Sequence, residues 1–327
     1  NTVVGDEAGT AITTGDGNVA VGFEALKTED AHGRNTAMGY QALKTLNAGA
    51  EAVTTTIGYQ AGTSLTTGVQ NTLIGGLSGD ALTDADYNVA VGNNTLSSDT
   101  KGSKSIAIGY EALVSQNFST STDSFNVAMG FQAGAAVTTG IQNTLIGGLA
   151  GDALTTANYN VAVGYNAAGS STTGHSNSVL GRHALKNNTT GSNNVAIGRD
   201  ALEANTTADD NTALGYNTLT ANTTGASNTS VGKFSLRYNT TGARNVAVGT
   251  SALTAHTTGA DNVGVGESAL SLNTTASNNT ALGSAALQAN TTGASNTAVG
   301  RAALNANTTA ANNTAVGYFA LVTSTTG

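Results

Sequence analysis

The sequence predicts an all-β protein, a parallel β-solenoid of nineteen coils of about 17 residues each. Three observations predict this fold: a glycine at fixed spacing, a short apolar strand pattern before it, and a turn motif after it. The chain has 327 residues, of which 10% are charged and 5% aromatic, and it contains no Pro, Cys or Trp. Because it lacks the large side chains that fill globular cores, it needs a regular stack of small residues to fold.

The recurring glycine, termed here the row glycine, sets the register. It occupies positions 5, 22, 39, 58, 75, 92, 109, 130, 147, 164, 181, 198, 215, 232, 249, 266, 283, 300 and 317. Sixteen of the eighteen intervals are 17 residues, and the other two are 19 and 21. Other positions of a coil are numbered from its row glycine, so that +1 follows the glycine. A fixed glycine implies positive φ or the close approach of another backbone.

The strand pattern lies before the row glycine. Position −1 is aliphatic in every coil, and position −3 is Thr, Val, Ile or Ser, as in Val19, Thr72 and Ile106. Apolar positions two apart predict a strand with one buried face. We therefore expect these two rows to form a narrow core between strands that pair in parallel. Position −2 is mostly Ala, so Ala and the row glycine are expected to form an opposite, small-residue stripe that contacts other subunits.

The second half of the coil carries Leu at +4 in thirteen coils, followed in four of them by Asn-Thr-Thr-Gly and in others by variants of it. This four-residue motif is typical of turns. We therefore expect two short strands and two turns in each coil.

Asparagine occupies position −4 in seventeen coils, with Thr54 and Ser105 as the exceptions. An exposed residue would be free to vary, so the pattern favours a stacked ladder of side-chain amides. The alternative is an asparagine-lined ligand groove.

Two insertions interrupt the register of what is expected to be one continuous solenoid over residues 1–327. They fall within residues 44–54 and 115–124 and are expected to bulge from the turn after the Leu segment. Loops on a rigid scaffold are common binding sites; simple tolerance of an insertion is the favoured alternative. The chain begins and stops inside a repeat, which predicts a fragment of a longer protein.

Aromatic residues gather at position +1. Packing against a neighbouring subunit is favoured over stacking on sugars for this row. Together with Phe118, at the edge of the second insertion, they are the candidate surface-contact residues: Phe23, Tyr40, Tyr59, Tyr110, Phe131, Tyr165, Tyr216 and Tyr318.

Little in the sequence suggests a catalytic, metal-binding or nucleic-acid-binding site. The net charge of −8 argues against a nucleic-acid partner. The four histidines show no partner at ligand spacing, and Glu29 and Asp30 are expected to be solvated in a turn, so no metal or cofactor is predicted. Nucleophile-elbow and phosphate-loop motifs are absent. The uncharged residues 124–151 are interrupted by polar residues and predict a coil, not membrane insertion.

The repeat resembles those of known fibres. Asn-Thr-Ala-Val-Gly-x-x-Ala-Leu, at residues 296–304, is similar to repeats of trimeric autotransporter adhesin heads. It is also similar to arrays upstream of intramolecular chaperone domains in phage tail-fibre proteins. The resemblance covers the whole chain and implies a left-handed β-roll and a homotrimer, located extracellularly on a cell surface or virion.

The expected function is therefore a non-enzymatic fibre shaft that mediates or supports attachment to a surface, with itself and a cell-surface glycan or other receptor as partners. An ice-binding or polysaccharide-binding solenoid is the alternative. Ice binding calls for Thr at alternate positions of an exposed strand. The regular pair here, such as Thr189 and Thr190, is adjacent and lies in a turn.

Overall fold

The computed structural model describes residues 1–325, which consist of short strands joined by turns. The chain forms two compact units, of which the first is Asn1–Asn160 and the second begins at Val161. Nineteen three-residue strands, one in each coil, lie just before the row glycines. The predicted parallel β-solenoid is thus confirmed.

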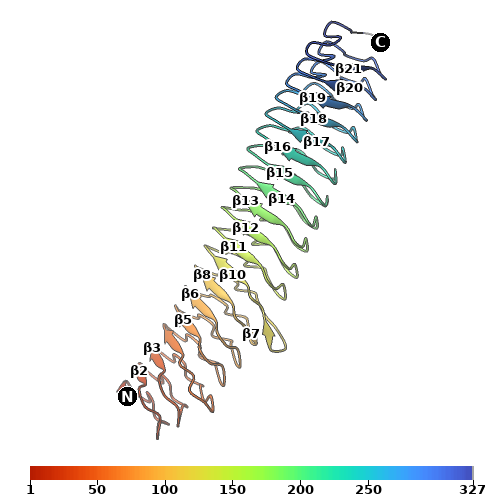
Figure 1. The fold of residues 1–327 in the computed structure, drawn as a ribbon. Helices are drawn as coiled ribbons and strands as arrows, with labels where there is room; N and C mark the ends of the chain where they lie inside the picture. The colour runs from red at the N-terminus through yellow and green to blue at the C-terminus, as the bar shows by residue number, and fades with distance from the viewer. Residues whose placement is uncertain (326–327) are drawn as a thin grey trace. The chain divides into compact units, whose positions relative to one another are not determined.

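In the first unit each strand pairs in parallel with the strand of the next coil (Figure 1). Each strand residue pairs with the residue at the same position of the next coil; Val19, for example, pairs with Thr36. The strands are β1 (Thr2–Val4), β2 (Val19–Val21), β3 (Thr36–Met38), β4 (Thr55–Ile57), β5 (Thr72–Ile74), β6 (Val89–Val91), β8 (Ile106–Ile108), β10 (Val127–Met129) and β11 (Thr144–Ile146).

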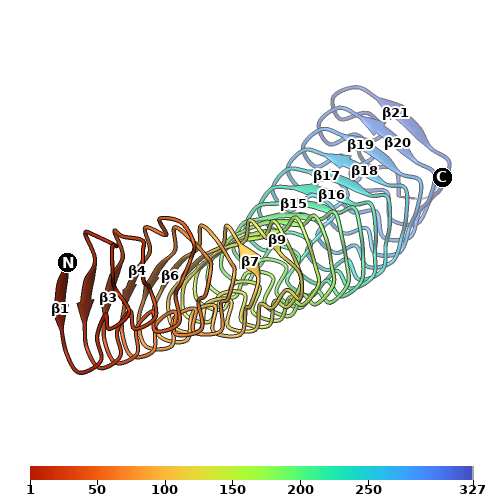
Figure 2. The same ribbon diagram turned by 90° about the horizontal axis from the view of Figure 1, so that it is seen from below.

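The second unit repeats this arrangement, again with parallel pairing from coil to coil. Figure 2 shows the coils of each unit stacked one on another. The strands are β12 (Val161–Val163), β13 (Ser178–Leu180), β14 (Val195–Ile197), β15 (Thr212–Leu214), β16 (Thr229–Val231), β17 (Val246–Val248), β18 (Val263–Val265), β19 (Thr280–Leu282), β20 (Thr297–Val299) and β21 (Thr314–Val316).

The prediction of a second strand around the Leu position was wrong. Residues at +2 and +4 adopt left-handed backbone conformations, as Phe234 (φ 60°) and Leu236 (φ 46°) illustrate. The Phe234 amide donates to Tyr216 of the preceding coil, and the Leu236 amide donates to Ala252 of the following coil. The segment therefore bonds to both neighbours without an extended ladder. A left-handed Leu costs about 1–2 kcal/mol, which burial of its side chain offsets.

The prediction of which strand side chains face the core was also wrong. Position −2 points inward: Ala247 is fully buried, whereas Val246 and Val248 on either side of it are partly exposed. Leu at +4, such as Leu253, is buried as well. The core of a coil this thin is therefore made of Ala and Leu, and the larger β-branched side chains lie outside it.

The sizes of the buried residues at −2 and +4 compensate for each other. Where two successive coils carry glycine at +4, position −2 of the second coil is Leu, as with Leu73 between Gly62 and Gly79. A Cβ at either glycine would lie 2.9 Å from a methyl group of Leu73. The same exchange recurs at Leu145, which packs against Gly134 and Gly151. Close packing without voids explains why one position shrinks where the other grows.

The row glycine is where backbones of neighbouring coils approach each other. Gly215 has φ +140°, and a Cβ there would lie 2.8 Å from the carbonyl of Gly232. The same clash, with the next row glycine, occurs along each unit. The expected Gly/Ala contact stripe is therefore wrong for this chain, because both residues face other parts of the same chain.

The asparagine ladder at −4 is confirmed. Asn194 Oδ1 accepts from the backbone amide of Asn211, 3.0 Å away, and Asn211 Nδ2 donates to the Gly225 carbonyl at 3.0 Å. These asparagines are buried, so the ladder supplies hydrogen-bond partners to backbone groups inside each unit.

A second buried ladder, which we did not predict from the sequence, lies at position +7. Asn222 Nδ2 donates to Asn205 Oδ1 at 3.1 Å and to the Gly225 carbonyl at 2.9 Å. This residue is the Asn of the Asn-Thr-Thr-Gly motif, for which the sequence predicts only a turn. The leucines at +7 in other coils, Leu46, Leu65, Leu82 and Leu154, are the signal that this position faces inward.

The two insertions leave the register intact. Residues 49–51 of the first are exposed, and Glu51 forms an ion pair with Arg34. The second insertion carries β9 (Thr122–Asp123), which pairs in parallel with β7 (Gly102–Ser103) of the preceding coil. Strand β8 pairs directly with β10 despite the 21-residue interval between their glycines.

Candidate functional surfaces

The outer face of the strands is a surface of partly exposed β-branched and aliphatic side chains. We name the side chains at positions −3 and −1 of all strands the sheet face. In the second unit Leu180 is 50% exposed and Leu214 is 43% exposed. In the first unit Met38, Ile57 and Met129 are exposed as well. Parallel sheets are normally covered on both faces, so an uncovered apolar face of this kind marks an interaction surface.

The predicted aromatic row at +1 is exposed. Phe23, Tyr40 and Tyr59 stack in successive coils with ring centroids 5.3 and 5.4 Å apart. Tyr110 and Phe131 form a similar pair at 5.5 Å. Because stacked rings cover each other's faces, these coils present ring edges, which favours packing over sugar stacking. The exposed members of the predicted set are Phe23, Tyr40, Tyr59, Tyr110, Phe131, Tyr165, Tyr216 and Tyr318.

The assignment of Phe118 to a contact surface was wrong, because its side chain is only 6% exposed. Its backbone amide donates to buried Asp99 at 3.2 Å, and its ring packs over Gly102, where a Cβ would lie 2.8 Å from the ring. Asp99 also accepts from Gly102 and from Gln116. The insertion thus turns Phe118 inward to close the enlarged coil.

Charged side chains lie beside the aromatic row in the first unit. Glu24 contacts Lys27 and Lys44, each at 2.6 Å, and accepts from Gln41 at 2.7 Å. These contacts, with Lys27 the largest influence, lower the pKa of Glu24 to about 2. The charges of Lys27 and Lys44, which lie beside the aromatic row, are therefore already paired with the Glu24 carboxylate.

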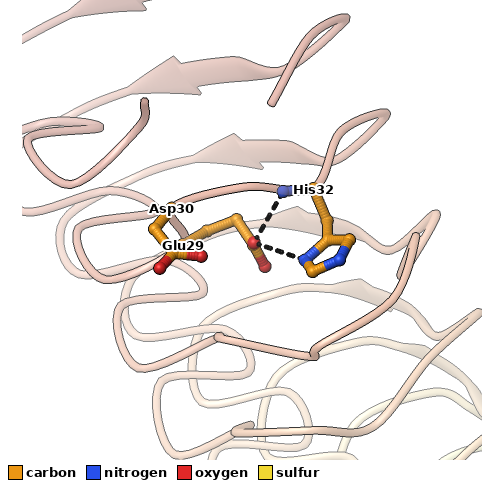
Figure 3. Close-up of side chains that lie close together, drawn as sticks. All are labelled: Glu29, Asp30 and His32. Carbon is orange, nitrogen blue, oxygen red and sulfur yellow. Dashed lines mark hydrogen bonds and ion pairs between the residues drawn. The ribbon is translucent and has the colours of Figure 1, made fainter. Parts of the chain in front are cut away.

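The prediction that Glu29 is solvated was wrong, and His32 does have neighbours that sequence spacing did not suggest. Glu29 is fully buried, and its Oε1 lies 3.1 Å from the His32 amide and 3.4 Å from His32 Nδ1 (Figure 3). Glu29, Asp30 and His32 offer possible ligand atoms within 4.8 Å of one another. In Figure 3 the Asp30 carboxylate points away from the imidazole. The geometry shows a carboxylate–imidazole contact. Glu29 occupies position +7, where coils of the second unit carry a ladder asparagine.

A second such group consists of His183, Asp200 and Glu203. His183 Nδ1 lies 3.6 Å from Asp200, and Asp200 also forms an ion pair with Arg199 at 3.0 Å. Burial, followed by the charges of Arg182 and Lys186, lowers the pKa of His183. Asp200 therefore has the Arg199 guanidinium as a close neighbour.

Residues 1–325 enclose no pocket. The same residues contain no helix that is long and apolar enough to cross a bilayer. No known family model, curated protein or solved structure matches the chain.

Proposed function

We propose that this chain is the shaft of a homotrimeric, left-handed fibre, located extracellularly on a cell surface or virion, where it supports attachment and has no enzymatic activity. The observation that carries the proposal is the sheet face, an outer surface with an aliphatic side chain at −1 in every coil. A face of this kind favours association with another copy that carries the same repeat.

Three features support a structural role. Neighbouring coils are joined by backbone pairing, by the asparagine ladder at −4, in the second unit also by the ladder at +7, and by close contact of row glycines. Deviations from the repeat are accommodated without loss of register. The resemblance of the repeat to trimeric adhesin heads and phage tail fibres supports three subunits in particular.

The mass of the chain in solution tests the proposal. Light scattering should give three times 32.2 kDa. A monomeric mass would contradict the trimer and leave the sheet face without its proposed partner.

Ice binding is a second candidate, because of one observation. Thr lies at −3 of many strands on the exposed side of the sheet, with an aliphatic residue two positions later, as in Thr72 and Ile74. Each such strand therefore presents one partly exposed Thr outward, which the adjacent turn threonines do not do from a strand, with an aliphatic side chain at the alternate position. Thermal hysteresis of the purified chain would support this candidate over the fibre, and its absence would remove it.

A further inference from the structure

Five of the seven cations of the second unit lie close together in the segment that follows the row glycine. We name Arg182, Lys186, Arg199, Lys233 and Arg237 the basic strip. Arg182, Arg199 and Lys233 occupy position +1, and Lys186 and Arg237 occupy +5, in coils that begin at Gly181, Gly198 and Gly232. Since coils stack at about 4.8 Å, the strip spans about 14 Å along the stack.

The strip differs from the cations of the first unit in lacking carboxylate partners. In the first unit all five cations form ion pairs: Lys27, Arg34, Lys44, Lys101 and Lys104. Within residues 1–325, only Arg199 of the basic strip has such a partner, Asp200. The +1 cations are exposed. A group of unpaired cations on a chain of net charge −8 is available to an external anion.

Nearby carboxylates do not cancel the positive charge of the basic strip. Asp200 and Glu203 are the carboxylates at positions +1 to +6 of these coils, so five cations less two carboxylates leave +3. Equivalent positions of the first unit carry Asp6, Glu7, Glu24, Asp80, Glu111 and Asp152 against Lys27 and Lys44, which gives −4. The positive surface is therefore confined to part of the second unit.

Aromatic rings are interleaved with these cations. The Arg199 guanidinium lies 5.6 Å from the centre of the Tyr216 ring, and Lys233 and Arg237 each lie 4.8 Å from that of Phe234. Tyr216 and Tyr238 are exposed. Unlike the stacked rings of the first unit, Tyr216 is tilted by 56° from its aromatic neighbour Phe234.

We propose that the basic strip binds an acidic polysaccharide, with its carboxylates or sulfates on the arginines and its sugar rings against Tyr216 and Tyr238. Guanidinium groups match planar anions, and aromatic rings pack on the apolar faces of sugars. A long nucleic acid fits less well, because it would extend over the acidic remainder of the chain. The inference deepens the proposed attachment function by naming the class of receptor, and it does not depend on the number of subunits.

The test is binding of the full chain to an immobilised polyuronate, with neutral dextran as the negative probe. The triple variant R182Q/K233Q/R237Q should bind polyuronate about tenfold or more weakly, and higher salt should weaken wild-type binding. The matched control R34Q/K101Q/K104Q removes the same charge from ion-paired positions of the first unit and should retain affinity. Y216A should reduce binding at unchanged charge.

Several results would overturn the proposal: no binding of polyuronate by the wild type, equal loss in the triple variant and its control, or binding only to duplex DNA or anionic phospholipid vesicles. Light scattering on the same samples separates this outcome from the proposed shaft. A threefold mass without polyuronate binding would reject the receptor class alone. Polyuronate binding by a monomer would reject the trimer alone.

Discussion

Nδ1 of His256 lies 3.3 Å from the side-chain nitrogen of Asn273, in the place where an asparagine oxygen lies in neighbouring coils of the +7 ladder. Its Nε2 lies 2.8 Å from the Gly259 carbonyl, where asparagine Nδ2 otherwise donates. The buried ring thus fits as a neutral tautomer, with its proton on Nε2. The neutral imidazole has no second N–H group to donate to Asn239 Oδ1, which is buried without a hydrogen-bond partner.

Replacing His256 with asparagine should therefore stabilise the fold. H256N supplies an amide that donates to both Asn239 and Gly259, so we expect a gain of about 1 kcal/mol. The midpoint of urea unfolding measures it. H256A, which restores no donor, should be less stable than the wild type, and a midpoint for H256N below that of H256A would contradict the ladder assignment.

Acidification should weaken the wild type through the same residue. Burial lowers the pKa of His256, with the Gly259 carbonyl opposing the shift, and no charged group contributes. The unfolded chain therefore binds the proton more readily, so stability is complete above the ordinary histidine pKa of about 6.5 and falls as pH decreases below it. The difference in urea midpoint between wild type and H256N should grow from pH 8 to pH 5. A constant difference would show that His256 does not titrate on unfolding.

Adding a methyl group at a row glycine should disrupt coil stacking. G215A places a Cβ at 2.8 Å from the Gly232 carbonyl in a backbone conformation that disfavours side chains, and we expect a loss of about 3 kcal/mol. Gly49, whose Cβ would meet no atom within 4 Å, provides the control. G49N should cost much less, since asparagine tolerates its φ of +67°. Equal unfolding midpoints for the two variants would contradict the close-approach argument.

The exchange of volume between −2 and +4 predicts a compensating pair. L73A should cost about 2–5 kcal/mol because it leaves a cavity beside Gly62 and Gly79. Adding G79L should recover part of that loss, since leucine adopts the same left-handed φ at +4 in other coils. A double-mutant cycle on unfolding midpoints measures the coupling. Additive losses would show that the two positions do not share one space.

Charges on the sheet face should separate the subunits without unfolding the coils. L180E and L214E together place carboxylates on the exposed side of β13 and β15, so the mass by light scattering should fall to that of a monomer. The control T224E/T241E adds the same charge at exposed turn positions and should remain trimeric. A threefold mass in both pairs would move the interface away from the sheet face.

Periodicity predicted the coil, its register and the parallel pairing, because a fixed spacing of 17 residues leaves few other arrangements. It did not reveal which side of the strand faces inward. Val246, Ala247 and Val248 are all apolar, so alternation alone is ambiguous, and hydrophobicity favours the wrong face. A shift of one residue inverts every side chain of a strand. The narrow interior, which admits only Ala beside Leu253, decides the question.

The candidate surfaces were predicted less well. The +1 aromatic residues were placed correctly on the surface, but Phe118 was not, because its burial depends on how an irregular loop folds over Gly102. Buried Glu29 was missed for a similar reason: it occupies the +7 position, whose inward direction follows from left-handed residues that no propensity scale anticipates. The unpaired cations could be recognised only once their neighbours were known.

The pairing of β7 with β9 shows how this architecture accepts foreign peptide. The added residues leave the turn, pair as β9 with β7 of the preceding coil, and return to the stack so that β8 and β10 meet in register. The corner of a coil therefore behaves as an insertion port. Descendants of such a chain can gain or exchange displayed segments there by recombination, while the parallel pairing of the strands continues underneath.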